Sequence, residues 1–393
     1  MATLYNFIID ESFGGSCVNA TVELENFFEP HEYTIFDKNI SDKSLLYYCL
    51  INSFGYPSFD IRDSRVKIPA DIIEKYHNGF DIKFVFWTIH ESDSPEAVKT
   101  LAEYADSLKI KQTDFYLSSG NQILEKQKKQ FGVDINIHSN NSIPRIMSGC
   151  MQQIKSHPFI IDREKLFQCY NRANKYHRSA IFTFFNKENL LDKVDLSYLK
   201  INEICCDNIH SVFGYGSGVL DSKISKEYFD ILKKIKEERG TVKSEFEKFE
   251  FDNGGPQHTL TYENNLYRHA YINVVTETQY EWEGVEHITE KSIQPFFYYQ
   301  IPIFLSTPGH VESMKRKWGL DFFEDIINHS YDSIESPSLR FNKITREILR
   351  LSKMENEIKE FFKNNQDRFE KNKEIIKDIS KCTIDRDFFR SLK

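Results

Sequence analysis

The sequence predicts an α/β protein of two domains, each with a parallel β-sheet wrapped by helices, followed by a helical tail. Apolar runs rich in β-branched and aromatic residues alternate with amphipathic helical patterns, and this alternation occurs in two series along the chain. Such alternation is typical of parallel sheets. A length of 393 residues also suits two domains of ordinary size.

The first series defines an N-terminal domain at residues 1–150. Its strongest strand is Ile82–Ile89, and the following stretch Glu96–Leu108 has the apolar spacing of a helix. Further strands are expected at Leu4–Ile9, Phe115–Leu117 and Ile135–Ile137, with a helix at Gln122–Phe131.

The second series defines a C-terminal domain at residues 151–340. Strands are expected at Lys165–Tyr170, Tyr271–Thr276 and Ile301–Leu305, and helices at Ser179–Leu191, Thr289–Tyr299 and His310–Trp318. The boundary between the domains falls around Asn141–Pro158. Residues 341–393 are helical in character, and we expect them to pack across both domains.

Composition narrows the class of protein. A net charge of −8 argues against a surface devoted to nucleic acid, although a local basic groove stays compatible with it. No apolar run is long enough for a membrane span, and the N-terminus lacks the features of a signal peptide. The seven cysteines show no metal-binding or disulfide spacing, which favours the reducing cytoplasm.

The segment Tyr271–Lys291 carries the most chemical information. A buried strand delivers Thr276 and Glu277 to its carboxyl end, where ligands bind in open α/β sheets. Thr289 then begins a helix as its N-cap, and the free N–H groups of a helix N-terminus attract anions. In the first turn, Lys291 offers a charge to a diphosphate and Glu290 can accept hydrogen bonds from ribose hydroxyls. The alternative is a surface helix that is merely capped.

The order of strand, Thr-Glu, loop, Thr-Glu-Lys, helix and Pro resembles the donor half of a family of glycosyltransferases. That family includes fucosyltransferase and exostosin-like groups and many phage-encoded transferases. The segment Leu166–Arg178 resembles its N-R-x-x-x-x-H-R element. The resemblance covers Glu164–Arg340, with a gap at Asp207–Arg268, and implies a GT-B architecture of two Rossmann-like domains. The N-terminal domain would hold the acceptor and the C-terminal domain the donor nucleotide sugar.

The resemblance also implies roles for single residues. Arg172 and Lys291 would ligate the donor phosphates, and Glu290 would bind the nucleotide ribose. The remaining candidates for the donor site are Arg178, Thr276, Glu277 and Thr289, and a capping and packing cluster is the alternative for the His-Arg pair that contains Arg178. The family often has Lys or Arg just before the Pro of the Thr-Glu-Lys helix, whereas this chain has Gln294, which leaves an extra phosphate contact in doubt.

Transfer with inversion needs a general base. Two acidic residues follow strands of the N-terminal domain, namely Glu91 and Asp10, and either could face the cleft; exposed polar turns are the alternative for both. The D-x-D pattern of metal-dependent transferases occurs only at Asp385–Asp387, in the helical tail. We therefore expect no bound metal and no cofactor besides the nucleotide-sugar co-substrate.

The sequence leaves the identity of the acceptor molecule open. Phage genomes often encode transferases with these motifs, which suggests sugar transfer to a 5-hydroxymethylated pyrimidine in phage DNA, in the host cytoplasm. A bacterial surface glycan is the alternative acceptor. A protein of another class, which binds a nucleotide or a glycan without catalysis, is the third hypothesis, because fold does not fix function.

Overall fold

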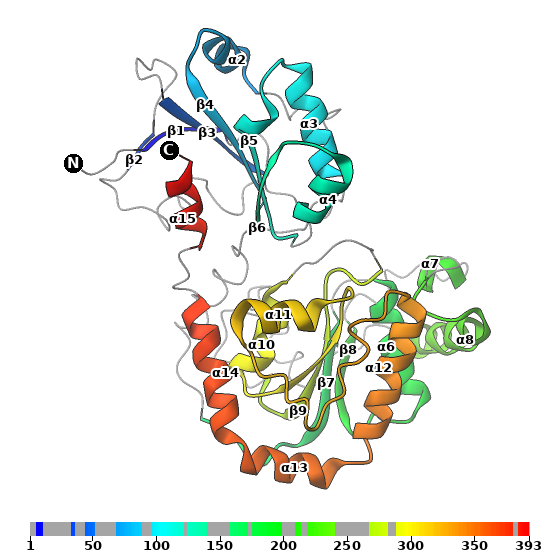
Figure 1. The fold of residues 1–393 in the computed structure, drawn as a ribbon. Helices are drawn as coiled ribbons and strands as arrows, with labels where there is room; N and C mark the ends of the chain where they lie inside the picture. The colour runs from blue at the N-terminus through cyan, green and yellow to red at the C-terminus, as the bar shows by residue number, and fades with distance from the viewer. Residues whose placement is uncertain are drawn as a thin grey trace. The chain divides into compact units, whose positions relative to one another are not determined.

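The computed structural model describes residues 5–10, 33–35, 44–51, 68–88, 96–121, 124–139, 158–171, 175–198, 209–213, 218–239, 267–281, 288–379 and 384–392. The chain forms two compact units. Unit 1 comprises Met1–Ile143, Gly284–His287 and Cys382–Lys393, and unit 2 comprises Pro144–Glu283 and Ile288–Lys381. Figure 1 labels the helices and strands of both.

The sheet of unit 1 has six strands in the order β2-β1-β3-β4-β5-β6, and all its pairs are parallel. Its strands are β1 (Tyr5–Asp10), β2 (Tyr33–Ile35), β3 (Ser44–Ile51), β4 (Asp81–Thr88), β5 (Phe115–Ser119) and β6 (Asn136–Ser139). Its helices are α2 (Ala70–His77), α3 (Ala97–Ser107), α4 (Leu124–Phe131) and α15 (Ile384–Ser391), with a 3₁₀ turn, η1, at Gln112–Asp114.

Helices cover both faces of this sheet, as the alternation along β4 shows. Phe84 and Phe86 belong to the core that includes the apolar side of α3. Trp87 points to the opposite face, because neighbouring side chains of a strand alternate. On that face its ring stacks on Phe389 of α15, with the centroids 5.2 Å apart. The last helix of the chain is therefore part of unit 1.

The sheet of unit 2 has four parallel strands in the order β10-β9-β7-β8. They are β7 (Lys165–Asn171), β8 (Val194–Tyr198), β9 (Ala270–Thr276) and β10 (Ile301–Leu305). The helices are α6 (Tyr176–Lys187), α7 (Ile209–Phe213), α8 (Ser222–Arg239), α10 (Glu290–Phe297), α11 (His310–Trp318), α12 (Pro337–Leu351), α13 (Glu355–Asn364) and α14 (Gln366–Ile379).

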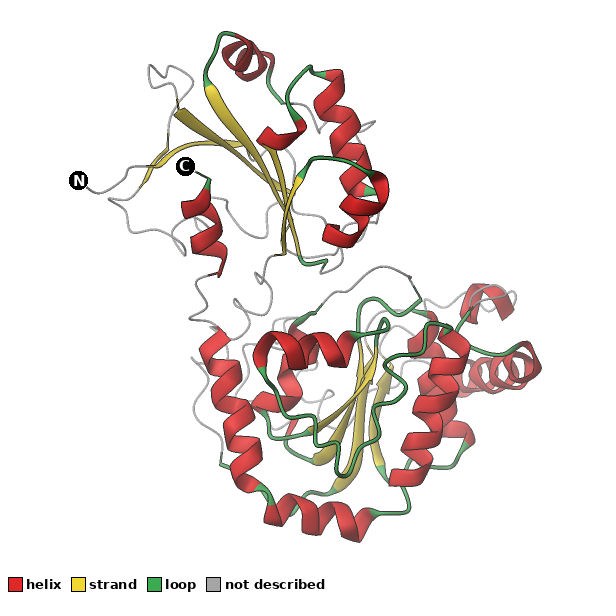
Figure 2. Ribbon diagram, viewed as in Figure 1, coloured by secondary structure: helices red, strands yellow, loops and turns green. Residues whose placement is uncertain are grey.

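Unit 2 is likewise a three-layer structure (Figure 2). Ile272 and Val274 of β9 lie in the core shared with α6, α8 and α12. Val275 points the other way, into the core formed with α10, α11 and α14. Every residue of β9 is buried, which explains why its sequence is apolar apart from Asn273 and the final Thr276.

These features confirm the predicted fold class of two Rossmann-like α/β domains with a helical C-terminal tail. Some elements differ from the expectation. The strands β2, β3 and β8 were not predicted, and α6 begins at Tyr176 instead of Ser179. In the tail, which was predicted only as a whole, α12 to α14 belong to unit 2 and α15 belongs to unit 1. Within the described ranges, no helix is both long and apolar enough to cross a membrane.

Candidate functional site

The order of the strands in unit 2 marks one position along the line formed by their carboxyl ends, which we call the carboxyl edge of the sheet. The chain runs from β7 to β8 on one side and then returns to place β9 on the other side of β7. The carboxyl ends of β7 and β9 therefore form a topological switch point, where open α/β sheets bind their ligands. Asn171 ends β7 and Thr276 ends β9, and the Thr276 hydroxyl donates to Asn171 Oδ1 at 2.9 Å.

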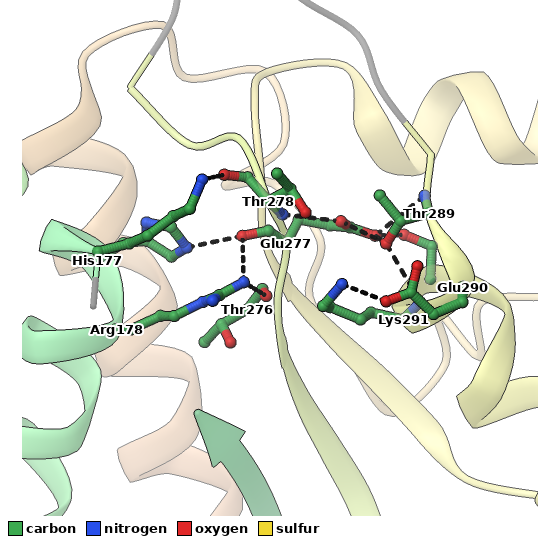
Figure 3. A network of polar contacts seen from close by, with 10 residues as sticks. His177, Arg178, Thr276, Glu277, Thr278, Thr289, Glu290 and Lys291 are labelled. Atoms are coloured by element: carbon green, nitrogen blue, oxygen red, sulfur yellow. Dashed lines mark hydrogen bonds and ion pairs between the residues drawn. The ribbon is translucent and has the colours of Figure 1, made fainter. Parts of the chain in front are cut away.

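The carboxylate of Glu277, directly after β9, is buried among hydrogen-bond donors (Figure 3). It accepts from the Thr278 N–H at 2.9 Å, and the Thr289 hydroxyl donates to both of its oxygens at 2.9 and 2.8 Å. The Ser292 hydroxyl and the Thr289 N–H (3.4 Å) also donate to Oε1. Glu277 thus fixes the start of α10 to the end of β9.

These donors decide the ionisation of Glu277. Burial by itself would raise the pKa of this carboxyl, but the charge of Lys291 and the hydrogen bonds from Ser292 and the Thr278 N–H outweigh burial and lower it to about 2. Glu277 is consequently an anion at any physiological pH, and it occupies the place that an external anion would take at the N-terminus of α10.

A buried histidine extends this network. His310 Nε2 lies 2.8 Å from Ser292 Oγ. Because the Ser292 hydroxyl gives its hydrogen to Glu277, its oxygen accepts from His310, so that Nε2 carries the hydrogen. Burial lowers the pKa of His310, and a neutral ring is consistent with this single donated bond.

Thr289 caps α10, as the sequence predicted. Its side chain accepts from the Lys291 N–H at 3.2 Å. In the first turn, the side chains of Glu290 and Lys291 form an ion pair and remain 21% and 34% exposed. Solvent therefore reaches both of these charged groups, whereas Glu277 is 1% exposed.

The start of α6 contacts the other side of the Thr276–Thr278 backbone. Lys175 Nζ donates to the Thr278 carbonyl at 2.9 Å. Arg178 is buried and donates to the carbonyls of Thr276 and Glu277, at 3.1 and 3.3 Å. His177 Nε2 lies 2.8 Å from the same Glu277 carbonyl. Two helices that follow neighbouring strands thus converge on the end of β9.

The structure brings six of the predicted site residues together at this edge: Arg178, Thr276, Glu277, Thr289, Glu290 and Lys291. Arg172 and Glu91 lie outside the described residues. Asp10 is the last residue of β1, in register with Cys49 of β3. Since the order β2-β1-β3 places the switch point of the unit 1 sheet between these two strands, Asp10 lies at the corresponding position of that sheet.

Sequence reasoning missed several residues of this edge. Ser292 and His310 complete the network around Glu277, and Glu281 lies 3.8 Å from His177 Nδ1. Ser292 is three residues after the N-cap, where a side chain can reach back over the helix start, and that spacing was the available signal. His310 comes from a different helix, and no local pattern predicts its position. Among the described residues, no group of three or more His, Cys, Asp or Glu side chains has the geometry of a metal site.

No protein-family model matches the chain, and neither does any curated protein. Among solved structures, the chain is similar to the α,α-trehalose 6-phosphate synthase of Burkholderia multivorans, with a TM-score of 0.37 at 10% identity over 89% of this chain and 70% of that one. The UDP-forming α,α-trehalose-phosphate synthase of Burkholderia vietnamiensis gives 0.39 at 10% identity, over 88% and 71%. The enzyme of Burkholderia xenovorans, in complex with glucose-6-phosphate, gives 0.39 at 10% identity, over 89% and 74%.

Proposed function

We propose that this protein is a nucleotide-sugar-dependent glycosyltransferase whose donor binds at the carboxyl edge of the unit 2 sheet. One observation carries the proposal. At the switch point between β7 and β9, the first turn of α10 presents the partly exposed ammonium of Lys291 and the partly exposed carboxylate of Glu290. The buried, hydrogen-bonded side chain of Glu277 holds this turn in place. A nucleoside diphosphate offers the complementary pair of groups, since it carries anionic phosphates and ribose hydroxyls. The resemblance of the motifs at this edge to donor-binding transferase motifs supports the same reading.

The ion pair between Glu290 and Lys291 suits this role. A diphosphate that approaches Lys291 exchanges one anionic partner for another, so that little charge is left unpaired. Glu290 is then free to accept hydrogen bonds from the ribose hydroxyls. As the bond to the sugar breaks, Lys291 stabilises the growing negative charge on the diphosphate. We propose Arg172, which follows β7, as the second phosphate ligand on the sequence argument alone.

The buried members of the site have a supporting role in this proposal. Arg178 donates to two backbone carbonyls and Glu277 accepts from the Thr289 hydroxyl, and both side chains are buried. They hold the ends of β9, α6 and α10 in fixed relative positions, together with Thr276 and Thr289. Preorganised contacts of this kind keep Lys291 in place without cost at the moment of reaction.

Binding of nucleotides tests the donor site. Wild type, Lys291→Ala and Arg172→Ala are titrated by calorimetry with UDP, GDP and CDP, with the exposed Lys353→Ala as control. A charged hydrogen bond contributes about 1.5–3 kcal/mol, so each site variant should bind the preferred diphosphate about 10–100-fold more weakly. Lys353→Ala should bind like wild type. Absence of binding to all three nucleotides, by a protein shown to be folded, would refute the donor site.

For the acceptor, we propose a 5-hydroxymethylated pyrimidine in DNA, which the sequence argument alone supports. A bacterial surface glycan is the alternative. Once the donor is known, transfer of radiolabelled sugar to hydroxymethylated and to unmodified DNA distinguishes them, because only the modified base offers the hydroxyl. A folded protein that binds the nucleotide but transfers its sugar to no acceptor and to no water molecule would instead be a binding protein.

A further inference from the structure

His177 and Glu281 face each other with two buried polar atoms that make no hydrogen bond within the described part of the chain. Glu281 Oε1 and His177 Nδ1 are 3.8 Å apart, and neither atom has a hydrogen-bond partner among the described residues. The His177 ring is fully buried and stacks on Tyr280, with the centroids 5.1 Å apart. The Glu281 side chain remains 26% exposed, so one end of the pair is reachable from solvent.

The hydrogen-bond pattern fixes the role of each nitrogen of His177. The Glu277 carbonyl, 2.8 Å from Nε2, can only accept, so Nε2 carries the hydrogen. In the neutral ring, Nδ1 is then an acceptor. An ionised Glu281 is also an acceptor, and two buried acceptors therefore face each other with no hydrogen between them. Leaving such groups unsatisfied is costly, and one added proton satisfies both.

The ionisation of the two groups agrees with this geometry. Burial lowers the pKa of His177, although Glu281 opposes this effect. Burial would raise the pKa of Glu281, but His177 outweighs it and the net change is downward. Near neutral pH the pair is therefore an anionic carboxylate beside a neutral imidazole, which is the state that lacks a proton.

The pair adjoins the proposed donor site. The His177 ring links Glu281 to the Glu277 backbone, and the Glu277 carboxylate binds Thr289, the N-cap of the helix that carries Lys291. We infer that Glu281, supported by His177, is the proton acceptor for the hydroxyl group that receives the sugar. This inference rests on the proposed transferase function and adds a catalytic residue to it. Glu281 belongs to unit 2, whereas the candidates that the sequence suggested for this role, Asp10 and Glu91, belong to unit 1.

The step balances as a single displacement. The oxygen of the acceptor hydroxyl forms a bond to the anomeric carbon of the sugar. The bond from that carbon to the diphosphate oxygen breaks, and its electron pair leaves with the diphosphate beside Lys291. The hydroxyl proton moves to a carboxylate oxygen of Glu281, and the Nδ1 lone pair of His177 shares it. Glu281 is the group that touches the substrate, and His177 is a positioning residue.

The test compares Glu281→Gln, His177→Gln and the control Glu355→Gln with wild type. Gln at 177 keeps a donor for the Glu277 carbonyl but removes the Nδ1 acceptor, and Glu355 lies on α13, where it pairs with Lys359. The nucleotide that binds wild type is titrated by calorimetry, and its sugar conjugate is then assayed for release of the nucleoside diphosphate, with water as the acceptor. The pH dependence of that release is recorded for each protein.

The expected result separates binding from turnover. Glu281→Gln should bind the nucleoside diphosphate as wild type does, turn over about 100-fold more slowly or worse, and lose the acidic limb of the pH profile. His177→Gln should shift that limb, and Glu355→Gln should change nothing. Unchanged turnover in a folded Glu281→Gln would overturn the inference and return the role of base to Asp10 or Glu91. Loss of nucleotide binding in this variant would also overturn it, in favour of a structural pair.

A second readout distinguishes failure of the inference from failure of the proposed function. In ¹⁵N-histidine-labelled protein, the signal that disappears in His177→Gln reports the proton on Nδ1. Its titration should move to lower pH in Glu281→Gln, because the carboxylate that shares the proton is gone. If wild type binds no nucleotide, the proposed function fails and the assignment of the base fails with it. If nucleotides bind but His177 titrates at the same pH in wild type and Glu281→Gln, the inference alone fails.

Discussion

At the scale of residues, the centre of the site is an ionised carboxylate whose charge is stabilised by neighbouring groups of the same chain. Glu277 accepts hydrogen bonds from the Thr278 backbone and from the hydroxyls of Thr289 and Ser292. A buried carboxylate is costly unless it is paired, and here the helix start, two hydroxyls and Lys291 share that role. The sequence motif predicts that the N-terminus of α10 binds an anion, and in this structure the bound anion is the carboxylate of Glu277.

Glu277→Gln should destabilise the folded protein in a pH-dependent way. A pKa lowered from 4.5 to about 2 stabilises the folded state by about 3 kcal/mol at neutral pH. Because the folded pKa is the lower one, this stabilisation is present above pH 4.5 and is lost as the pH falls towards 2. Urea unfolding of wild type and variant over this range measures the difference, which should shrink with acidification.

The exposed Glu360→Gln provides the control, because a solvated carboxylate contributes little to stability. It should unfold like wild type at every pH. A constant difference between Glu277→Gln and wild type from neutral to acidic pH would show that the amide disturbs packing and that the charge of Glu277 stabilises nothing.

At the scale of elements, α10 depends on its cap. Thr289 accepts from the Lys291 N–H and donates to Glu277, so one hydroxyl joins the helix start to the strand end. Thr289→Ala should cost about 1–2 kcal/mol and speed hydrogen exchange of the α10 amides, as expected for loss of an N-cap. Thr289→Ser retains the hydroxyl and should exchange like wild type. Equal exchange in all three proteins would mean that packing of Ile293 and Phe296 alone holds the helix.

Local patterns predicted this part of the fold well. The all-buried strand β9, the Thr289 cap and the first-turn pair Glu290 and Lys291 all follow from residue type and short spacing. The sequence did not predict β3, whose eight residues form a central strand between β1 and β4. An apolar run of this kind shows no alternation, and no recognisable helical pattern precedes it in the sequence, so periodicity could not distinguish it.

Contacts between distant segments were beyond such patterns. The carboxylate of Glu277 meets Ser292 and, through it, His310, whereas Arg178 reaches the Thr276 carbonyl across 98 positions of sequence. No local spacing predicts these pairs, because the fold of the sheet brings them together. The same limit explains why Glu281 was not recognised: its partner His177 lies before β8, on a helix that follows a different strand.

At the scale of the whole molecule, the division of the tail links the end of the chain to its beginning. Phe389 of α15 is fully buried and stacks on Trp87, while Phe388 stacks on His138 with the centroids 4.1 Å apart. These rings cover the face of the unit 1 sheet opposite α3. Unit 1 is therefore completed by residues that follow the whole of unit 2 in the sequence.

Phe389→Ala should consequently destabilise unit 1 and leave unit 2 unchanged. Removing a buried phenylalanine costs about 3–5 kcal/mol, which is a large fraction of the roughly 5–15 kcal/mol by which a domain is stable. Hydrogen exchange followed by mass spectrometry resolves the two units. Peptides of β4 and β5 should exchange faster in the variant, and peptides of β9 and α12 should keep their wild-type rates. The exposed Ser391→Ala, on the same helix, should alter neither set. Faster exchange in β9 as well would show that the two units unfold together, and unit 1 would then not be an independent folding unit closed by α15.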